Sequence, residues 1–260
     1  MYPRSVDRRF RLARIWSNAQ LRAIAPLFDG CVINVSAGDD LDKEGKRYEE
    51  YFVNSSGYSI SNFQPGSFRG FQGRANELLI DLCEEIPVHL RASYDVAFNH
   101  TTLEHVFDFR TAFRNICALS KDIVILVVPF SQVQHASAAF DDYWRFAPAG
   151  IRQLFQNEGF RVVYEAANDH RNSAVYLVFV GARKVEKWRD RMPAWSPITS
   201  AGAQIGRESS LSWSSRFSAL LRAVLTAAGA LKGTPPWYGT GSTSCTRSGS
   251  AVNCGKWSDE

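Results

Sequence analysis

The chain has few of the features that define several large protein classes. Its 260 residues include only five cysteines, and no two of them form a Cys-x-x-Cys pair. Neither a disulfide framework nor a zinc site is therefore predicted. No apolar run reaches the roughly 18 residues of a membrane span, and the start is too charged for the apolar core of a secretory signal. We expect a cytoplasmic protein.

The excess of positive over negative charge is also small. The formal net charge is only +4 at pH 7, whereas nucleic-acid binding requires a clustered basic face. Nucleic acid is therefore not an expected partner. One basic cluster does stand near the start, and we interpret it as the solvated face of a helix. Its members are Arg4, Arg8, Arg9, Arg11 and Arg14.

The apolar pattern predicts an α/β protein. From residue 31 to 182 strands alternate with helices or loops, which favours a Rossmann-like, doubly wound and mostly parallel sheet. The run 123–128 is apolar throughout and rich in β-branched residues, as in strands buried on both faces. The expected strands are 31–35, 57–61, 78–82, 94–98, 123–128, 160–165 and 175–180, and the expected helices are 6–27, 44–52, 104–119 and 148–158.

Composition divides the chain into three parts. Residues 1–28 form an N-terminal amphipathic helix, and residues 29–192 form the Rossmann-like domain. Residues 193–260 are rich in Gly, Ser and Thr and are expected to be a flexible extension. One helix is predicted there at 211–231, with a broad apolar face. Such a helix either lies on a membrane or packs on the domain, and packing is the commoner case.

The most informative segment is 94–108. An apolar strand runs into a short polar turn and a helix opens at once, so polar residues stand at the carboxyl end of a strand, where ligands bind in open α/β sheets. The element Leu-Glu-His-Val at 103–106 resembles the class I S-adenosylmethionine-dependent methyltransferases. A second segment has His135 followed by Asp-Tyr-Trp-Arg-Phe-Ala-Pro at 142–148. It is similar to a methyltransferase branch found in sugar and polysaccharide gene clusters, with Ala147 in place of Thr. The resemblance covers roughly residues 29–183.

The resemblance implies S-adenosylmethionine as cofactor, bound along the first four strand ends. The glycine-rich turn after the first strand keeps only Gly38, and Asn34 replaces its acid. Asn62 stands where the family has the acid that binds both ribose hydroxyls. Asp81 stands where an acid meets adenine, and a turn cap is the alternative for it. The expected cofactor-binding residues are Asn34, Ser36, Ala37, Gly38, Asn62, Phe63, Asp81, Leu82, Asn99, His100 and Thr101.

Methyl transfer is an in-line displacement, so alignment of the reactants contributes most. A hydroxyl acceptor also benefits from a base. His135 is the first candidate for that base, and His105 or His100 is the second. The reaction requires no metal, although His100, Glu104 and Asp141 can in principle converge.

The acceptor side is expected in the segment after the fifth strand. Asp141, Tyr143 and Arg145 are candidates for binding hydroxyls or an anionic group of a sugar or another small molecule. The alternative is that Arg145 pairs with Asp141 or Asp142, and that Tyr143, Trp144 and Phe146 are core aromatics.

Two functional hypotheses follow. The first is a methyltransferase that acts on a sugar, glycan or other small-molecule acceptor, with a role in polysaccharide biosynthesis. The alternative is a catalytically inactive relative that binds a partner or serves as a scaffold, because glycines and the ribose-binding acid are missing. The sequence leaves the acceptor and the oligomeric state open.

Overall fold

The computed structural model describes residues 11–67, 69–134, 136–137, 140–170, 173–198 and residue 205. His135, the first candidate base, lies outside the described residues. So does the helix predicted at 211–231. Within the described part, no helix is both long and apolar enough to cross a membrane.

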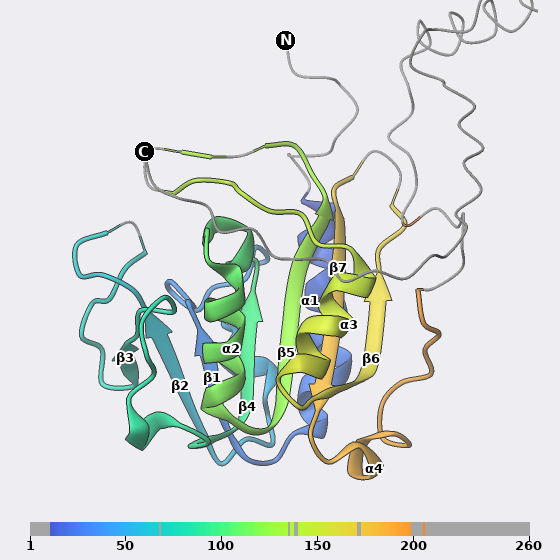
Figure 1. Ribbon diagram of the computed structural model, residues 1–260, viewed down its shortest axis with the longest axis horizontal. Helices are drawn as coiled ribbons and strands as arrows, with labels where there is room; N and C mark the ends of the chain where they lie inside the picture. Colours follow the sequence, from blue (N-terminus) through green and yellow to red (C-terminus); the bar gives the residue numbers. More distant parts are fainter. Residues whose placement is uncertain are drawn as a thin grey trace, which may run out of the picture. The chain divides into compact units, whose positions relative to one another are not determined.

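The strands form a seven-stranded sheet in the order β3-β2-β1-β4-β5-β7-β6 (Figure 1). Neighbours from β3 to β5 are parallel, and β7 runs antiparallel between β5 and β6. This confirms the predicted Rossmann-like fold class. The strands are β1 Cys31–Val35, β2 Gly57–Asn62, β3 Glu77–Leu79, β4 Tyr94–His100, β5 Ser120–Ser131, β6 Arg161–Ala167 and β7 Val175–Ala182.

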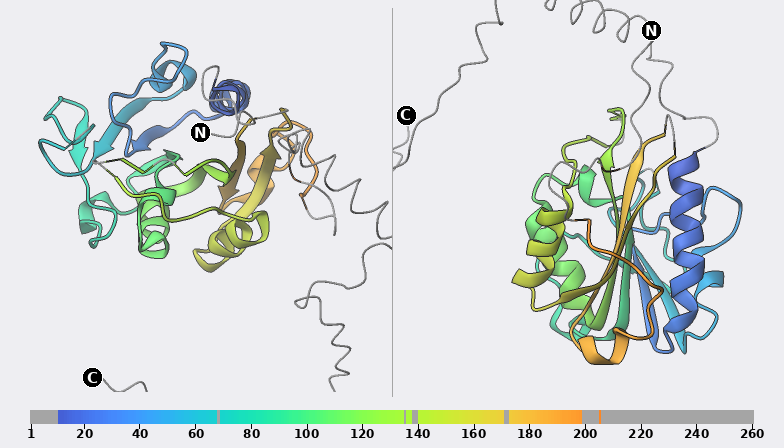
Figure 2. Two further views of the ribbon diagram at one scale, coloured as in Figure 1. Left: turned by 90° about the horizontal axis from the view of Figure 1, so that it is seen from above. Right: turned by 90° about the vertical axis from the view of Figure 1, so that its right-hand side faces the viewer.

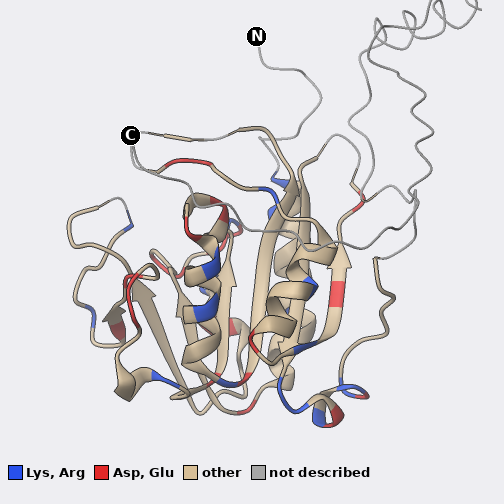
Figure 3. Cartoon of the chain, in the orientation of Figure 1, with Lys and Arg blue, Asp and Glu red and all other residues tan. Residues whose placement is uncertain are grey.

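Helices cover both faces of the sheet (Figure 2). The N-terminal helix α1 packs on one face, and α2 and α3 pack on the other. Basic and acidic positions are interspersed along the described elements in Figure 3, in keeping with the small net charge. The helices and helical turns are α1 Leu12–Ile24, η1 Ala25–Leu27, η2 Tyr48–Tyr51, η3 Val88–Leu90, η4 Leu103–His105, α2 Phe109–Leu119, α3 Pro148–Asn157 and α4 Val185–Trp188.

Strand β5 lies between two hydrophobic cores. Ile123 and Ile125 point into the core under α1, whereas Val124 and Leu126 point into the core under α2 and α3. Alternate side chains of a strand point to opposite faces, so a strand buried on both faces must be apolar at every position. The interpretation of 123–128 as a doubly buried strand is confirmed.

Two predicted helices are shorter in the structure, for identifiable reasons. The helix expected from residue 104 begins at Phe109, because Asp108 caps it by accepting a hydrogen bond from the Thr111 amide at 3.2 Å. The helix expected at 44–52 is only the turn η2. There the Asp42 carboxylate accepts hydrogen bonds from the backbone N–H groups of Glu44 and Lys46, and this turn competes with helix formation. No α-helix therefore follows β1 directly.

Candidate active site at the carboxyl edge of the sheet

The turn after β1 is tied to the end of β2. The Ala37 N–H donates to the Ser61 carbonyl at 3.0 Å, and the Gly38 N–H donates to Asn62 Oδ1 at 2.7 Å. Ser36 and Gly38 both have positive φ, 58° and 60°, a conformation that favours glycine. These bonds fix the path of the turn and occupy its amides.

Asn34 has an internal partner. Its Nδ2 donates to Asp40 Oδ1 at 2.8 Å, and the Tyr58 hydroxyl donates to the same oxygen at 2.7 Å. Both Asn34 and Asp40 are buried. A buried carboxylate, that of Asp40, thus lies beside Asn34, and this pairing is not visible in the sequence.

Asn62 is also fully hydrogen-bonded within the protein. Besides accepting from the Gly38 N–H, it donates through Nδ2 to the Gly38 carbonyl at 2.9 Å and to Glu77 Oε1 at 2.6 Å. Burial acts to raise the pKa of Glu77, but hydrogen bonds from Asn62 and from the Arg74 and Gln72 amides hold it below its ordinary value. Glu77 is therefore a carboxylate beside the expected ribose position that the sequence did not reveal.

The segment 64–74 folds back over this turn. Arg74 donates to the Gly38 carbonyl at 3.0 Å and to Asp39 Oδ1 at 2.7 Å. The side chain of Arg69 lies 3.2 Å from the place where a Cβ on Gly38 would stand. Phe63, at the end of β2, is 49% exposed. Because Gly38 has no side chain, the side chain of Arg69 can lie close to its backbone.

Asp81 forms the turn cap that was its alternative reading. Its Oδ1 accepts a hydrogen bond from the Cys83 N–H at 2.8 Å. The next residue, Leu82, is buried in the core under α2. A contact of either residue with adenine stays a prediction.

Asn99 lies near the end of β4, beside β1. Its Nδ2 donates to the Val35 carbonyl at 2.9 Å, and its Oδ1 is a buried acceptor with no hydrogen-bond partner among the described residues. Because buried polar atoms are nearly always hydrogen-bonded, this oxygen is a candidate ligand contact.

His100 is enclosed by α1. Arg14 Nη1 lies 2.8 Å from His100 Nδ1, and because a guanidinium only donates, Nδ1 must accept. The ring proton is therefore on Nε2, which donates to Ser17 Oγ at 2.9 Å. Burial, and next the positive charge of Arg14, hold the pKa of His100 well below its ordinary value. Both ring nitrogens are occupied, so this arrangement argues against His100 as the base.

Arg14 reaches the end of β4 from the first turn of α1. Its Nη2 donates to Thr101 Oγ1 at 2.5 Å, and Thr101 has a positive φ of 52°. Burial acts to lower the pKa of Arg14, but Tyr176, Tyr48 and Glu104 hold it above its ordinary value. The prediction of a solvated basic helix face is wrong for Arg14, because tertiary packing turns this side chain toward the sheet.

Glu104, in η4 directly after β4, is the most unusual group at this edge. It is 1% exposed, and neither carboxyl oxygen has a hydrogen-bond partner among the described residues. Burial raises the pKa of Glu104 to about 7, against the opposing pull of Arg14 and Arg145. The sequence placed Glu104 in an informative motif and indicated it, with His100 and Asp141, as one of the groups that can converge, but not as a candidate base.

His105 stands next to this carboxyl group. Its Nδ1 donates to the Asp141 carbonyl at 2.5 Å, because a carbonyl oxygen only accepts. Its Nε2 lies 3.8 Å from Glu104 Oε1. His105 is thus held with one nitrogen toward the segment after β5 and the other toward Glu104.

The segment after β5 is bonded to η4. The Tyr143 amide donates to the Glu104 carbonyl at 2.8 Å. This bond joins the segments 103–106 and 142–148, which carry the resemblance described above. The Tyr143 hydroxyl donates to Asp141 Oδ2 at 2.6 Å. Arg145 pairs with both oxygens of Asp142, at 2.6 and 2.7 Å. The alternative reading of Arg145 as an ion-pair partner is confirmed.

Two aromatic residues of this segment are structural, as the alternative predicted, whereas the alternative is wrong for Tyr143, which is 45% exposed. Phe146 is buried in the core under α2 and α3, and Trp144 packs against that core. Trp144 Nε1 also donates to the Val106 carbonyl at 3.1 Å. His100, Glu104 and Asp141 do not converge: within the described part of the chain, no three His, Cys, Asp or Glu residues are grouped to hold a metal ion.

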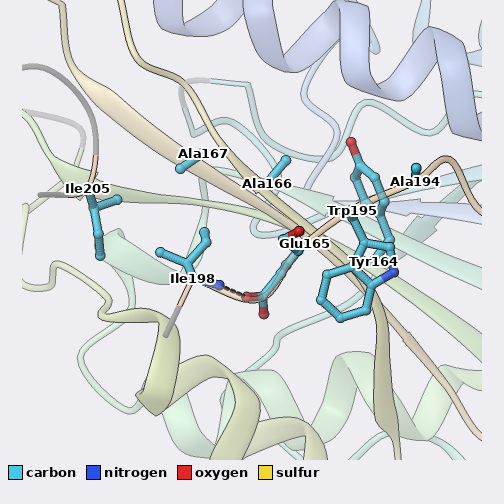
Figure 4. A pocket seen from close by; sticks show the side chains of 9 residues that line it. Tyr164, Glu165, Ala166, Ala167, Ala194, Trp195, Ile198 and Ile205 are labelled. Atoms are coloured by element: carbon cyan, nitrogen blue, oxygen red, sulfur yellow. Dashed lines mark hydrogen bonds between the residues drawn. The ribbon is translucent and has the colours of Figure 1, made fainter. Parts of the chain in front are cut away.

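A cavity of about 390 Å³ lies elsewhere, on the edge strand β6 (Figure 4). Its carboxylate, Glu165, accepts from Arg152 at 2.7 and 2.9 Å and from the Ile198 N–H. Trp195 and Ile198 form part of its wall. The Glu165 carboxylate is already bonded within the protein, and none of the predicted site residues lines this cavity.

Comparison with known proteins gives structural likenesses. No family model matches the chain, and no curated protein matches it. Among solved structures, it is similar to the Burkholderia thailandensis 1,6-didemethyltoxoflavin-N1-methyltransferase with bound S-adenosylhomocysteine, at 18% identity and a TM-score of 0.44, over 65% of this chain and 80% of that one. It is also similar to the magnesium protoporphyrin IX methyltransferase of Synechocystis PCC 6803 with bound S-adenosylmethionine, at 13% identity and a TM-score of 0.41, over 67% and 80%. At these TM-scores, neither likeness transfers an activity or a ligand to this chain.

Proposed function

We propose that the protein is an S-adenosylmethionine-dependent methyltransferase acting on a sugar or another small-molecule acceptor. The parallel strands place the ends of β1, β2 and β4 at one edge of the sheet, the usual ligand position in such folds. The observation that carries the proposal is a pair of buried groups at the β4 end without hydrogen-bond partners among the described residues: Asn99 Oδ1 and the Glu104 carboxyl. Such groups suit a ligand that brings hydrogen-bond donors.

The residues present fit the methionine end of the cofactor. When bound, S-adenosylmethionine supplies a methyl group activated on a positively charged sulfur. Asn99 Oδ1 would accept a hydrogen bond from the amino group of the methionine part, and the exposed ring of Phe63 would stack on adenine. At the ribose, Asn62 would offer a weaker bond than a carboxylate, and only by exchanging one of its internal partners.

Positive charge near this edge favours an acceptor that carries negative charge, such as a sugar phosphate or a nucleotide sugar. Burial, and next the nearby Arg69, Arg14 and Arg11, lower the pKa of Lys43 to about 8. Cations that repel one another in this way are stabilised by a bound anion. A phosphate group has the charge and the acceptor oxygens to fill that role.

A second candidate function is binding without catalysis. It is favoured by the internal bonds of Asn62 and of the Ala37 and Gly38 amides, which occupy the groups that would meet adenosine. In that case the same edge would hold a partner or a different ligand.

Calorimetric titration with S-adenosylmethionine and S-adenosylhomocysteine separates the two candidates. The methyltransferase predicts micromolar binding, weakened about tenfold in Asn99→Ala, because an acceptor to a charged donor is lost. Asn157→Ala, which removes an amide paired with Gln153 at the exposed end of α3, is the matched control and should bind as the wild type does. Absence of binding at millimolar cofactor would favour the second candidate.

A further inference from the structure

We propose that Glu104 accepts the proton of the acceptor's hydroxyl or amine during methyl transfer, with His105 as its proton partner. This inference rests on the proposed function and adds the identity of the base. The primary proton acceptor is then a carboxyl group and not one of the histidines expected from the sequence. The geometry of η4 supports this assignment.

The first reason is the isolation of the Glu104 side chain. A carboxyl group removed from water is normally ion-paired or hydrogen-bonded, as Glu165 is with Arg152 at 2.7 Å. Glu104 is equally buried, yet both of its oxygens lack hydrogen-bond partners among the described residues. No hydrogen bond from the described residues therefore competes with a ligand for these two oxygens.

The second reason is the position of His105. Its Nε2 stands 3.8 Å from Glu104 Oε1, which is too long for a direct hydrogen bond. A third atom can nevertheless lie at about 2.8 Å from both, within hydrogen-bond range of each. Since Nδ1 is bonded to the Asp141 carbonyl, Nε2 is the ring nitrogen on the side of Glu104. A hydroxyl that donates to Glu104 would therefore lie close to His105.

Burial and the surrounding charges together set the pKa of Glu104. Arg14 from α1 and Arg145 from the segment after β5 stabilise the ionised carboxylate, Asp142 opposes it, and His105 lies beside it on its own turn. Burial outweighs the two cations and brings the pKa of Glu104 to about 7. A base of this strength is well matched to proton transfer at neutral pH.

The step balances in atoms and electrons. As the acceptor oxygen or nitrogen forms its bond to the methyl carbon, its proton passes to a Glu104 carboxyl oxygen, and the electron pair of the breaking sulfur–carbon bond stays on sulfur, which leaves as the neutral thioether. The proton then moves from Glu104 to His105 Nε2 or to water. No redox partner and no metal take part in this step.

The first test compares full-length wild-type protein with Glu104→Gln, which keeps the shape and removes the base. Transfer of a radiolabelled methyl group from S-adenosylmethionine to a panel of nucleotide sugars should fall by about 10²–10⁴-fold, the usual contribution of a general base. Cofactor affinity by calorimetry should stay within about twofold. The matched control is Glu165→Gln, a buried glutamate on β6 outside the site, which should leave transfer unchanged. Equal rates in wild type and Glu104→Gln would overturn the proposal.

The second test needs no activity and separates the two proposals. Infrared titration of the ligand-free protein should show one buried protonated carboxyl with a midpoint near pH 7. The signal should be absent in Glu104→Gln, present in Glu165→Gln and displaced in His105→Asn. If the cofactor does not bind or no sugar is methylated, the proposed methyltransferase function is wrong. The titration then still tests whether Glu104 and His105 share a proton: a midpoint near pH 7 supports this pair, and absence of the signal contradicts it.

Discussion

Replacement of Glu104 by glutamine should change how the stability of the protein depends on pH. The pKa of Glu104 is about 7 in the folded protein, against an ordinary value of 4.5. Between those values the unfolded chain has lost the proton and the folded protein still holds it. Stability therefore falls as pH rises through this window, and the loss is complete above pH 7. Glutamine does not ionise, so the variant escapes this loss.

The magnitude follows from the distance between the two pKa values. About 2.5 pKa units at about 1.4 kcal/mol each give roughly 3 kcal/mol. Glu104→Gln should match the wild type near pH 4.5 and exceed its free energy of unfolding by up to that amount at pH 8. This is an unusual sign for a substitution in a candidate site. It reflects a carboxylate whose burial costs more than the nearby cations Arg14 and Arg145 return.

Urea denaturation at several pH values between 4.5 and 8 measures the effect. The free energy of unfolding should decline with pH in the wild type more steeply than in Glu104→Gln, with equal m-values. Glu165→Gln serves as the control, because it leaves Glu104 in place and should keep the extra decline. Parallel curves for wild type and Glu104→Gln would refute the reasoning that Glu104 is protonated in the folded protein near neutrality.

Four further single substitutions test the rest of the site and the core. Asn62→Asp, which restores the acid typical of the family, should lower cofactor affinity in calorimetry because its carboxylate would face Glu77, 2.6 Å away, and adding Glu77→Gln should recover it. Gly181→Ala should cost about 1–3 kcal/mol in urea denaturation, since its Cβ would overlap an aromatic ring of α3. Gly150→Ala has open space and should gain up to about 1 kcal/mol instead. Gly38→Ala should lower the thermal midpoint, because φ is +60° there and the left-handed conformation costs a residue with a Cβ about 1–2 kcal/mol.

The sequence located the strands well because burial leaves a direct mark on composition. The run 123–128 is apolar at every position, and β5 is indeed buried on both faces. Helix ends were less predictable, because they depend on local side-chain bonds. Asp42 and Asp108 each redirect the backbone through such bonds. The spacing of apolar residues along the sequence carries no information about these bonds.

For the candidate site, too, the sequence predicted the location but not the side-chain contacts. The sequence placed polar residues at the end of β4 and joined them to the segment after β5, and the bond from Tyr143 to Glu104 agrees with that. It ranked His135 before His105 and His100 as the base but could not tell which of these rings is available, because the amino-acid type alone gives each a near-neutral pKa. Only the folded protein shows that His100 is occupied by Arg14 and Ser17.

The sequence by itself determined the fold class, the extended apolar strands and the region of the chain where ligands should meet the sheet. These properties depend on periodicity and on neighbours in the chain. The tertiary structure decided the sheet order, the burial of Arg14 against β4 and the burial of Glu104 without a hydrogen-bond partner among the described residues. Those depend on groups far apart in the sequence, since the partners and the solvent exposure of a side chain are fixed only when the elements pack.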